Sequence, residues 1–162
     1  MRSLSVRSVE RDRSTNSFVV TFREDDQPRR QFEIFVGLTE GMVMKMMLEG
    51  ESSPRPLTHD LFLLALERLS VQVRRVVLTH VSNGTYFAEI TLAPEEGEEV
   101  TISCRPSDGT ALALKSHAPL YASESLLDEV GRGPEDQEGE SEEILDEFKE
   151  FIENISPEDF DI

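Results

Sequence analysis

The strongest constraint on the fold of this chain is a pair of apolar-rich segments joined by Asn83 and Gly84. Asn-Gly is the dipeptide preferred in two-residue type I′ turns. Residues 71–82 and 85–94, on either side of it, are rich in the β-branched and aromatic residues typical of strands. The sequence therefore predicts a long β-hairpin within a mixed or antiparallel sheet.

The turn also predicts which side chains share a face of the hairpin, because it sets His80 opposite Phe87 and side chains alternate along a strand. The more apolar face is expected to lie against the core, and it holds Val77, Val81, Tyr86, Ala88, Ile90 and Leu92. The other face holds His80, Leu78, Val76, Phe87, Glu89 and Thr91.

The rest of the chain up to Gly131 alternates between strand and helix patterns. Strands are expected at 3–10, 17–24, 30–37, 100–104 and 120–122, and helices at 38–50, 58–70, 107–118 and 123–131. Thr39, Thr58 and Ser107 are the expected N-caps, and Gly50 is the expected residue after a helix end. In helix 58–70, Leu61, Leu64, Ala65 and Leu69 fall at core spacing. These elements predict a single α+β domain with its helices packed on the sheet.

The acidic residues are concentrated at the C-terminus. The chain of 162 residues has a formal net charge of -17, but residues 1–131 carry 14 basic and 20 acidic residues, whereas residues 132–162 carry 2 and 13. We expect a domain over 1–131, and an acidic linker with an amphipathic C-terminal helix over 132–162. The apolar stripe of that helix contains Phe148 and Phe151.

This composition excludes a generally basic, nucleic-acid-coating protein. There is no apolar run long enough to span a bilayer, and the polar N-terminus does not resemble a signal peptide. The single cysteine, Cys104, fits a reducing compartment, so the expected location is the cytoplasm, without membrane association.

Two Arg-Pro dipeptides, Arg55-Pro56 and Arg105-Pro106, stand just before predicted helices. A helix start offers free backbone N–H groups and the positive end of the helix dipole, and an arginine adds a fork suited to phosphate oxygens. If the fold brings these helix starts together, Arg55, Arg105, Thr58 and Ser107 form an anion site. The alternative is structural, because caps and acidic residues in a first turn also stabilise helices without any ligand.

Acidic residues near these helix starts would repel a phosphate unless a cation bridged them. We therefore expect Asp60, Asp108 and Glu40 to bind a divalent cation, with Mg²⁺ the ordinary partner of carboxylates and phosphate oxygens. His59 would then exchange a proton with water or with the leaving oxygen, and the expected catalytic residues are His59, Asp60, Asp108 and Glu40. His80 is expected to be a strand residue beside Phe87, because no other chemically active residue stands near it in the sequence. Cys104 is expected to be a small buried hydrophobe, and no general base is assigned to it.

The chain resembles the bifunctional nuclease domain family. The segments that carry the resemblance are 37–40 (GLTE), 55–61 (RPLTHDL), 83–88 (NGTYFA), 105–114 (RPSDGTALAL) and 118–121 (APLY). Family members tend to have alanine where this chain has Gly41 and Gly109, and each glycine is expected to cost its helix about 1 kcal/mol.

The resemblance implies an α+β domain that self-associates, as a homodimer or a higher homo-oligomer, and a nuclease with both DNase and RNase activity. DNA or RNA would be a transient substrate. The site proposed above rests on the chemistry of the residues, since the resemblance brings no agreed catalytic set. The alternative function is a non-catalytic module that binds an anion or regulates a partner.

The acidic tail gives a further expectation. We expect the helix with Phe148 and Phe151 to dock on the body or on a neighbouring copy, so that its carboxylates compete with phosphate for Arg55 and Arg105.

Overall fold

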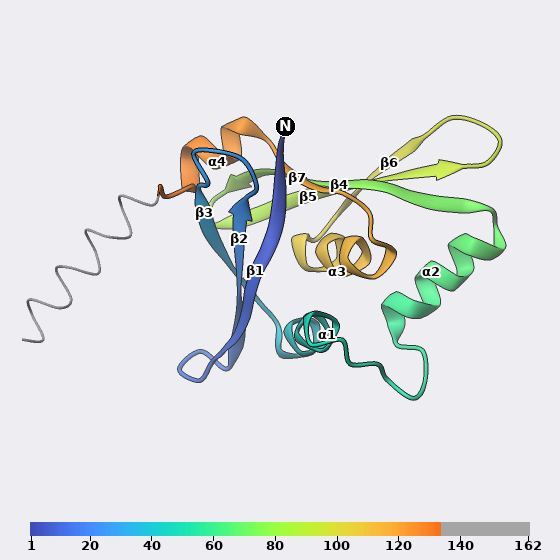
Figure 1. The fold of residues 1–162 in the computed structure, drawn as a ribbon, viewed down its shortest axis with the longest axis horizontal. Helices are drawn as coiled ribbons and strands as arrows, with labels where there is room; N and C mark the ends of the chain where they lie inside the picture. The colour runs from blue at the N-terminus through green and yellow to red at the C-terminus, as the bar shows by residue number, and fades with distance from the viewer. Residues whose placement is uncertain (134–162) are drawn as a thin grey trace, which may run out of the picture.

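The computed structural model describes residues 1–133, which form an α+β domain of seven strands and four helices (Figure 1). In chain order these are β1 (Arg2–Asp12), β2 (Ser17–Glu24), β3 (Gln31–Val36), α1 (Leu38–Leu48), α2 (Thr58–Arg68), β4 (Val71–Ser82), β5 (Thr85–Pro94), β6 (Val100–Cys104), α3 (Pro106–Ser116), β7 (Leu120–Ala122) and α4 (Glu124–Val130). The predicted fold class is confirmed. The predicted amphipathic segment with Phe148 and Phe151 lies outside the described residues.

One mixed sheet organises the domain, with the strand order β3-β2-β1-β7-β4-β5-β6. The short β7 pairs with β1 on one side and with β4 on the other, so it joins the first three strands to the central hairpin. Among the described strands, only β4 and β7 run parallel. The sheet curls strongly, as one ring contact shows. The centroids of the Phe32 ring on β3 and the Tyr86 ring on β5 are 6.3 Å apart, although other strands separate β3 from β5 in the sheet.

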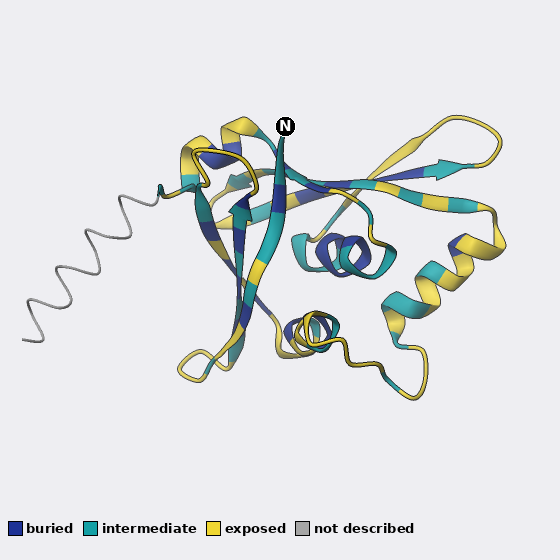
Figure 2. Cartoon of the chain, in the orientation of Figure 1, coloured by how far each residue is buried: buried dark blue, intermediate teal, exposed yellow. Residues whose placement is uncertain are grey.

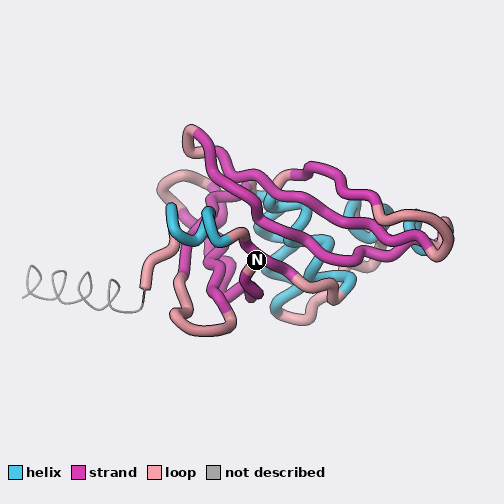
Figure 3. Tube along the Cα trace, turned by 90° about the horizontal axis from the view of Figure 1, so that it is seen from above, coloured by secondary structure: helices cyan, strands magenta, loops and turns pink. Residues whose placement is uncertain are grey.

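Three helices lie on one side of the curled sheet and α4 lies on the other (Figures 1 and 3). Helix α1 packs on β1 and β2, α3 packs on β4 and β5, and α2 packs on α3 and β4. The buried core lies between these helices and the sheet, as Figure 2 shows. No helix in the described part of the chain is long and apolar enough to cross a membrane.

The predicted hairpin is present, and Asn83 and Gly84 both have positive φ, 49° and 74°, as a type I′ turn requires. His80 is paired with Phe87 as predicted. The predicted buried face is right for Ala88, Ile90 and Leu92 on β5 but wrong for part of β4, where Val76 and Leu78 are buried in place of Val77. The cause is a β-bulge at Thr79, since one extra residue reverses the alternation beyond it.

The predicted core face of α2 is also wrong. Leu61, Leu64 and Leu69 are 64%, 43% and 71% exposed, Ala65 is exposed as well, and Leu66 is the buried residue of this helix. The helix projects from the domain and touches it along one side only, which leaves most of its apolar side chains in solvent (Figure 2).

Two helix glycines mark close contacts between helix and sheet. A Cβ at Gly41 of α1 would lie 2.3 Å from the Phe18 side chain on β2, and one at Gly109 of α3 would lie 2.9 Å from Val76 on β4. The expectation that these glycines only loosen their helices is therefore incomplete, because each allows a helix to approach the sheet more closely than alanine would. Gly50 follows the end of α1 with a φ of +71°, as predicted.

Candidate functional site

The first turns of α1, α2 and α3 meet at one place in the fold. Their N-cap residues are Gly37, Leu57 and Arg105, so the three predicted acidic residues, Glu40, Asp60 and Asp108, all occupy the third helical position. Acidic side chains are favoured there by the helix dipole and by free N–H groups. Each of the three helix starts therefore already carries a carboxylate, where the sequence predicts an anion site at two of them.

The caps themselves differ from the prediction. Thr39 and Ser107 are second helical residues, Thr58 is a first helical residue, and none of the three helices has a side-chain cap at its N-cap residue. The two Arg-Pro dipeptides are not equivalent either, because Arg105 is an N-cap whereas Arg55 lies two residues before one. The sequence similarity therefore does not extend to the positions of the arginines.

Arg105 is the centre of the site. Its Nε and Nη2 donate to the two Asp108 carboxylate oxygens at 2.7 and 2.9 Å, and its Nη1 lies 3.2 Å from Glu40 Oε1 on α1. The hydrogen bonds from Arg105 hold the pKa of Asp108 below its ordinary value. Two-thirds of the Arg105 side chain remains exposed, so the guanidinium is held in place and still accessible.

His59 of α2 completes this cluster. Its Nε2 lies 3.5 Å from Asp108 Oδ1, and its side chain is 13% exposed. The Nδ1 atom is buried and has no hydrogen-bond partner among the described residues. Proton exchange with a bound molecule would therefore have to use Nε2, the nitrogen that faces Asp108.

Asp60 points away from the cluster. Its Oδ2 accepts the Leu57 N–H at 2.8 Å, and its Oδ1 binds the Lys115 ammonium group of α3. The hydrogen bond from Lys115 is the largest cause of a pKa of Asp60 below its ordinary value. Lys115 is not among the residues predicted from the sequence, although it stands seven residues after Asp108 and so two turns along the same face of α3.

These contacts bear on the predicted metal site. Glu40 and Asp108 both bind Arg105 while Asp60 binds Lys115, so the three carboxylates do not face a common point. Within residues 1–133, no group of three or more His, Cys, Asp or Glu side chains is arranged to hold a metal ion. The donor set therefore does not fit a metal held by these three residues.

The predicted phosphate-binding residues are only partly brought together. Arg105 and the half-buried Ser107 lie in the first turn of α3, whereas Arg55 and Thr58 are exposed near the start of α2. Arg55 forms no ion pair with any residue of the described region.

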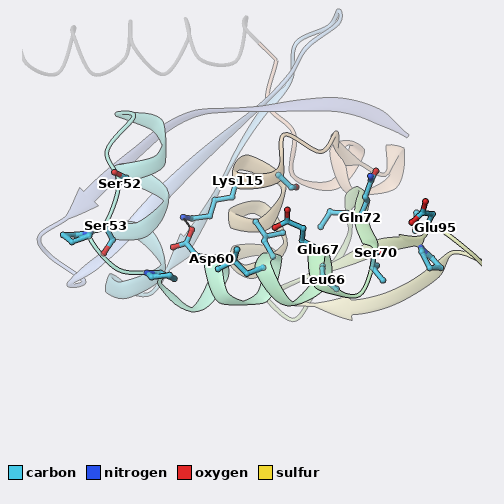
Figure 4. A pocket seen from close by; sticks show the side chains of 18 residues that line it. Ser52, Ser53, Asp60, Leu66, Glu67, Ser70, Gln72, Glu95 and Lys115 are labelled. Carbon is cyan, nitrogen blue, oxygen red and sulfur yellow. Dashed lines mark hydrogen bonds and ion pairs between the residues drawn. The ribbon is translucent and has the colours of Figure 1, made fainter.

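A cavity of about 1130 Å³ lies beside the cluster, between α2, the end of α3, the loop before α2 and the β4 and β5 strands (Figure 4). Asp60 and Lys115 stand at its edge, and its floor is apolar, with Leu63, Leu66 and Val73. It contains no aromatic side chain on which a base could stack.

Two further sequence candidates do not belong to the cluster. His80 stacks on Phe87 on the hairpin, with ring centroids 4.4 Å apart, as expected for a strand residue. Burial raises the pKa of Cys104 to about 11, with a smaller contribution from Asp108, so the thiol is not an activated nucleophile.

Comparison with known proteins finds a family match over most of the chain. A family model described as the bifunctional nuclease domain matches residues 20–134, which include all the residues of the cluster. Two uncharacterized proteins of Mycobacterium tuberculosis, from strains CDC 1551 and H37Rv, are each 29% identical to the chain over 166 residues, covering 99% of this chain and 98% of each relative.

Proposed function

The chain belongs to the bifunctional nuclease domain family, and from that premise we propose that it hydrolyses phosphodiester bonds of DNA and RNA at the cluster around Arg105. The observation that carries the proposal is the exposed guanidinium of Arg105 at the meeting point of three helix N-termini. The helix dipoles and the Arg105 fork favour a phosphate there once Glu40 leaves Nη1, because Asp108 alone then offsets the charge of the arginine. We expect this activity in the cytoplasm, as the sequence indicates.

Arg105 is the proposed phosphate ligand. Asp108 engages Nε and Nη2, which orients the guanidinium, while Nη1 is bound by Glu40 from a different helix. A phosphate oxygen would replace Glu40 at Nη1, and the displaced carboxylate would then lie beside the reacting phosphorus. This exchange keeps the arginine paired at every stage.

His59 and the displaced Glu40 are the proposed proton-transfer groups. His59 Nε2 lies 3.5 Å from Asp108 Oδ1, which orients the ring in the cluster. One group takes a proton from the attacking water, and the other gives a proton to the oxygen that leaves phosphorus. Asp108 acts by orienting both Arg105 and His59.

The carboxylates around Arg105 are already engaged, so they do not offer free ligands to the predicted divalent cation. Only Glu40 and Asp108 are near the phosphate position, and both are bound to Arg105. Cleavage with Mg²⁺, Mn²⁺ or EDTA distinguishes a metal-assisted reaction from one carried by Arg105, His59 and Glu40 alone.

The second candidate function is non-catalytic anion binding. One observation favours it, since Arg105 is already shared by two carboxylates and a small dianion could exchange with them without any reaction. In that case the domain would bind inorganic phosphate or an oligonucleotide and leave it intact.

The experiment that tests the proposal is cleavage of single- and double-stranded DNA and RNA by the purified chain with Mg²⁺, Mn²⁺ or EDTA. We expect His59→Gln and Asp108→Asn to lose most activity, whereas His80→Gln, an exposed histidine outside the cluster, keeps it. Undiminished activity in the first two folded variants would place the reaction elsewhere. Binding without cleavage under all three conditions would favour the second function.

A further inference from the structure

Asp60 is held at both of its carboxylate oxygens. Oδ2 accepts the N–H of Leu57, the residue that caps α2, and Oδ1 binds the ammonium group of Lys115 on α3. The Asp60 and Lys115 side chains face each other at the edge of the cavity, as Figure 4 shows. One contact fixes Asp60 within the first turn of its own helix, and the other ties that turn to a second helix.

The neighbouring residue makes a second attachment to the same helix. His59 Nε2 lies 3.5 Å from Asp108, which stands seven residues before Lys115 on α3. At 1.5 Å of rise per residue, the two attachment points on α3 are about 10 Å apart along its axis. A turn held at two separated points can neither slide nor rotate on its partner, whereas one contact would allow rotation.

Apolar packing holds α2 mainly beyond its first turn, where Leu63 packs partly buried against the core and Leu66 is buried. Leu66, in the second half of the helix, is its buried residue, and the side chains that precede it are exposed or half-buried. The cavity of about 1130 Å³ leaves space beside α2 into which the helix could move. The polar contacts to α3 are therefore what sets the position of the first turn.

We infer that Asp60 and Lys115 are positioning residues, which hold the first turn of α2 so that His59 stays within reach of Asp108. Asp60 then has neither the catalytic nor the metal-binding role expected from the sequence. The kinetic consequence of this inference rests on the proposed function, but the geometric consequence does not. The contact between His59 and Asp108 should loosen when the ion pair is removed, whatever reaction the site performs.

The kinetic test compares the full chain with Lys115→Met, which removes the charge and keeps the length of the side chain. We expect kcat on a single-stranded DNA oligonucleotide to fall by about tenfold or more, since small displacements of reacting groups are costly. KM should change less than about twofold, because Arg105 keeps both of its carboxylate partners. Lys115→Arg, which preserves the charge, should restore most of kcat.

Two further variants guard against a trivial result. Lys45→Met makes the same change at an exposed lysine of α1 that pairs with Glu49, and kcat should stay at the wild-type value. Asp60→Asn keeps an oxygen for the Leu57 N–H but loses the ion pair, so it should reproduce the fall in kcat even where Lys115→Met does not fold. A fall no larger than in Lys45→Met, or a rise in KM with kcat unchanged, would overturn the inference.

A second readout separates this inference from the proposed function. The imidazole signals of the three histidines can be followed by NMR and assigned with His59→Gln. Lys115→Met and Asp60→Asn should shift the His59 signals well beyond any change in Lys45→Met. Shifted signals in a protein without cleavage activity would support the positioning role and contradict the nuclease proposal, whereas unshifted signals would overturn the positioning role alone.

Discussion

Asp108 binds Arg105 through two parallel hydrogen bonds, Nε to Oδ2 at 2.7 Å and Nη2 to Oδ1 at 2.9 Å, within the first turn of a single helix. This geometry uses the planar fork of arginine and directs its remaining nitrogen, Nη1, toward Glu40 on another helix. Asp108 occupies a position where an acidic residue stabilises a helix, and it also orients the Arg105 guanidinium that we propose as the phosphate ligand.

Replacement of Arg105 by lysine should weaken substrate binding although the charge is kept. Lysine cannot bind Asp108 through two nitrogens and still present a third, so we expect affinity for a single-stranded oligonucleotide to fall roughly tenfold. Fluorescence anisotropy at low salt measures the change. Arg68→Lys, at an exposed arginine of α2, is the control, and equal losses in the two variants would refute a specific role of Arg105.

Alanine at Gly41 should destabilise this protein, although alanine is the better helix former by about 1 kcal/mol. The new Cβ would lie 2.3 Å from Phe18, so α1 or β2 must shift. We expect the free energy of unfolding to fall by about 1 to 3 kcal/mol, a typical cost of overpacking, as measured by urea denaturation. Thr39→Ala, at an exposed site on the same helix, should change it little, and a stabilised Gly41→Ala would contradict the close packing.

Glu24 should control the acid stability of the domain. Its side chain is fully buried on β2 and binds Arg30 at 3.1 Å as well as Arg2. Burial alone would raise the pKa of Glu24, but the hydrogen bonds from Arg30 and Arg2 outweigh it and hold this pKa below its ordinary value of 4.5. The resulting stability is complete above about pH 4.5 and is lost as the pH falls through the lower pKa of the folded state.

Urea unfolding between pH 3 and pH 7 tests this expectation. Glu24→Gln should lower the free energy of unfolding near neutral pH by about 2 kcal/mol, because it removes charge-assisted hydrogen bonds to Arg30 and Arg2, while Arg30 keeps its ion pairs with Glu124 and Asp128. The variant should also lose less stability than the wild type below pH 4.5. Glu10→Gln, at an exposed site on β1, is the control, and equal pH profiles in wild type and Glu24→Gln would show that Glu24 does not carry the effect.

The outer face of α2 is where we propose that the domain self-associates. Leu61, Phe62, Ala65 and Leu69 lie exposed on this face without a charge among them, so two copies can meet there despite the acidity of the chain. Leu61→Glu should reduce the mass measured by analytical ultracentrifugation. Phe35→Glu, at an exposed site on β3, should not, and dissociation by Phe35→Glu alone would place the contact on β3.

Removal of the acidic tail should raise affinity for nucleic acid. Arg132 is bridged to Gln31, so the truncation should end after Gly133 and delete residues 134–162. If the tail carboxylates compete with phosphate for Arg55 and Arg105, the truncated protein should bind an oligonucleotide more tightly at low salt and about equally at high salt. Unchanged affinity at low salt would show that the tail does not reach these arginines.

The sequence by itself determined the local structure. Asn83 and Gly84 predicted the hairpin and its register near the turn, and residues 17–24, 120–122 and 123–131 were predicted close to their observed strands and helix. These features depend on backbone preferences of a few neighbouring residues, such as the positive φ of a type I′ turn. The same local rules placed Glu40, Asp60 and Asp108 near helix starts.

Only the tertiary structure decided which of these groups meet. The bulge at Thr79 reversed the buried face of β4, and the position of α2 at the side of the domain left Leu61 and Leu69 in solvent. Lys115 binds Asp60, while Glu40 and Asp108 converge on Arg105 from two helices. Spacing along one chain cannot distinguish these pairings, because an ion pair across the fold depends on how helices pack and not on the residues beside each charge.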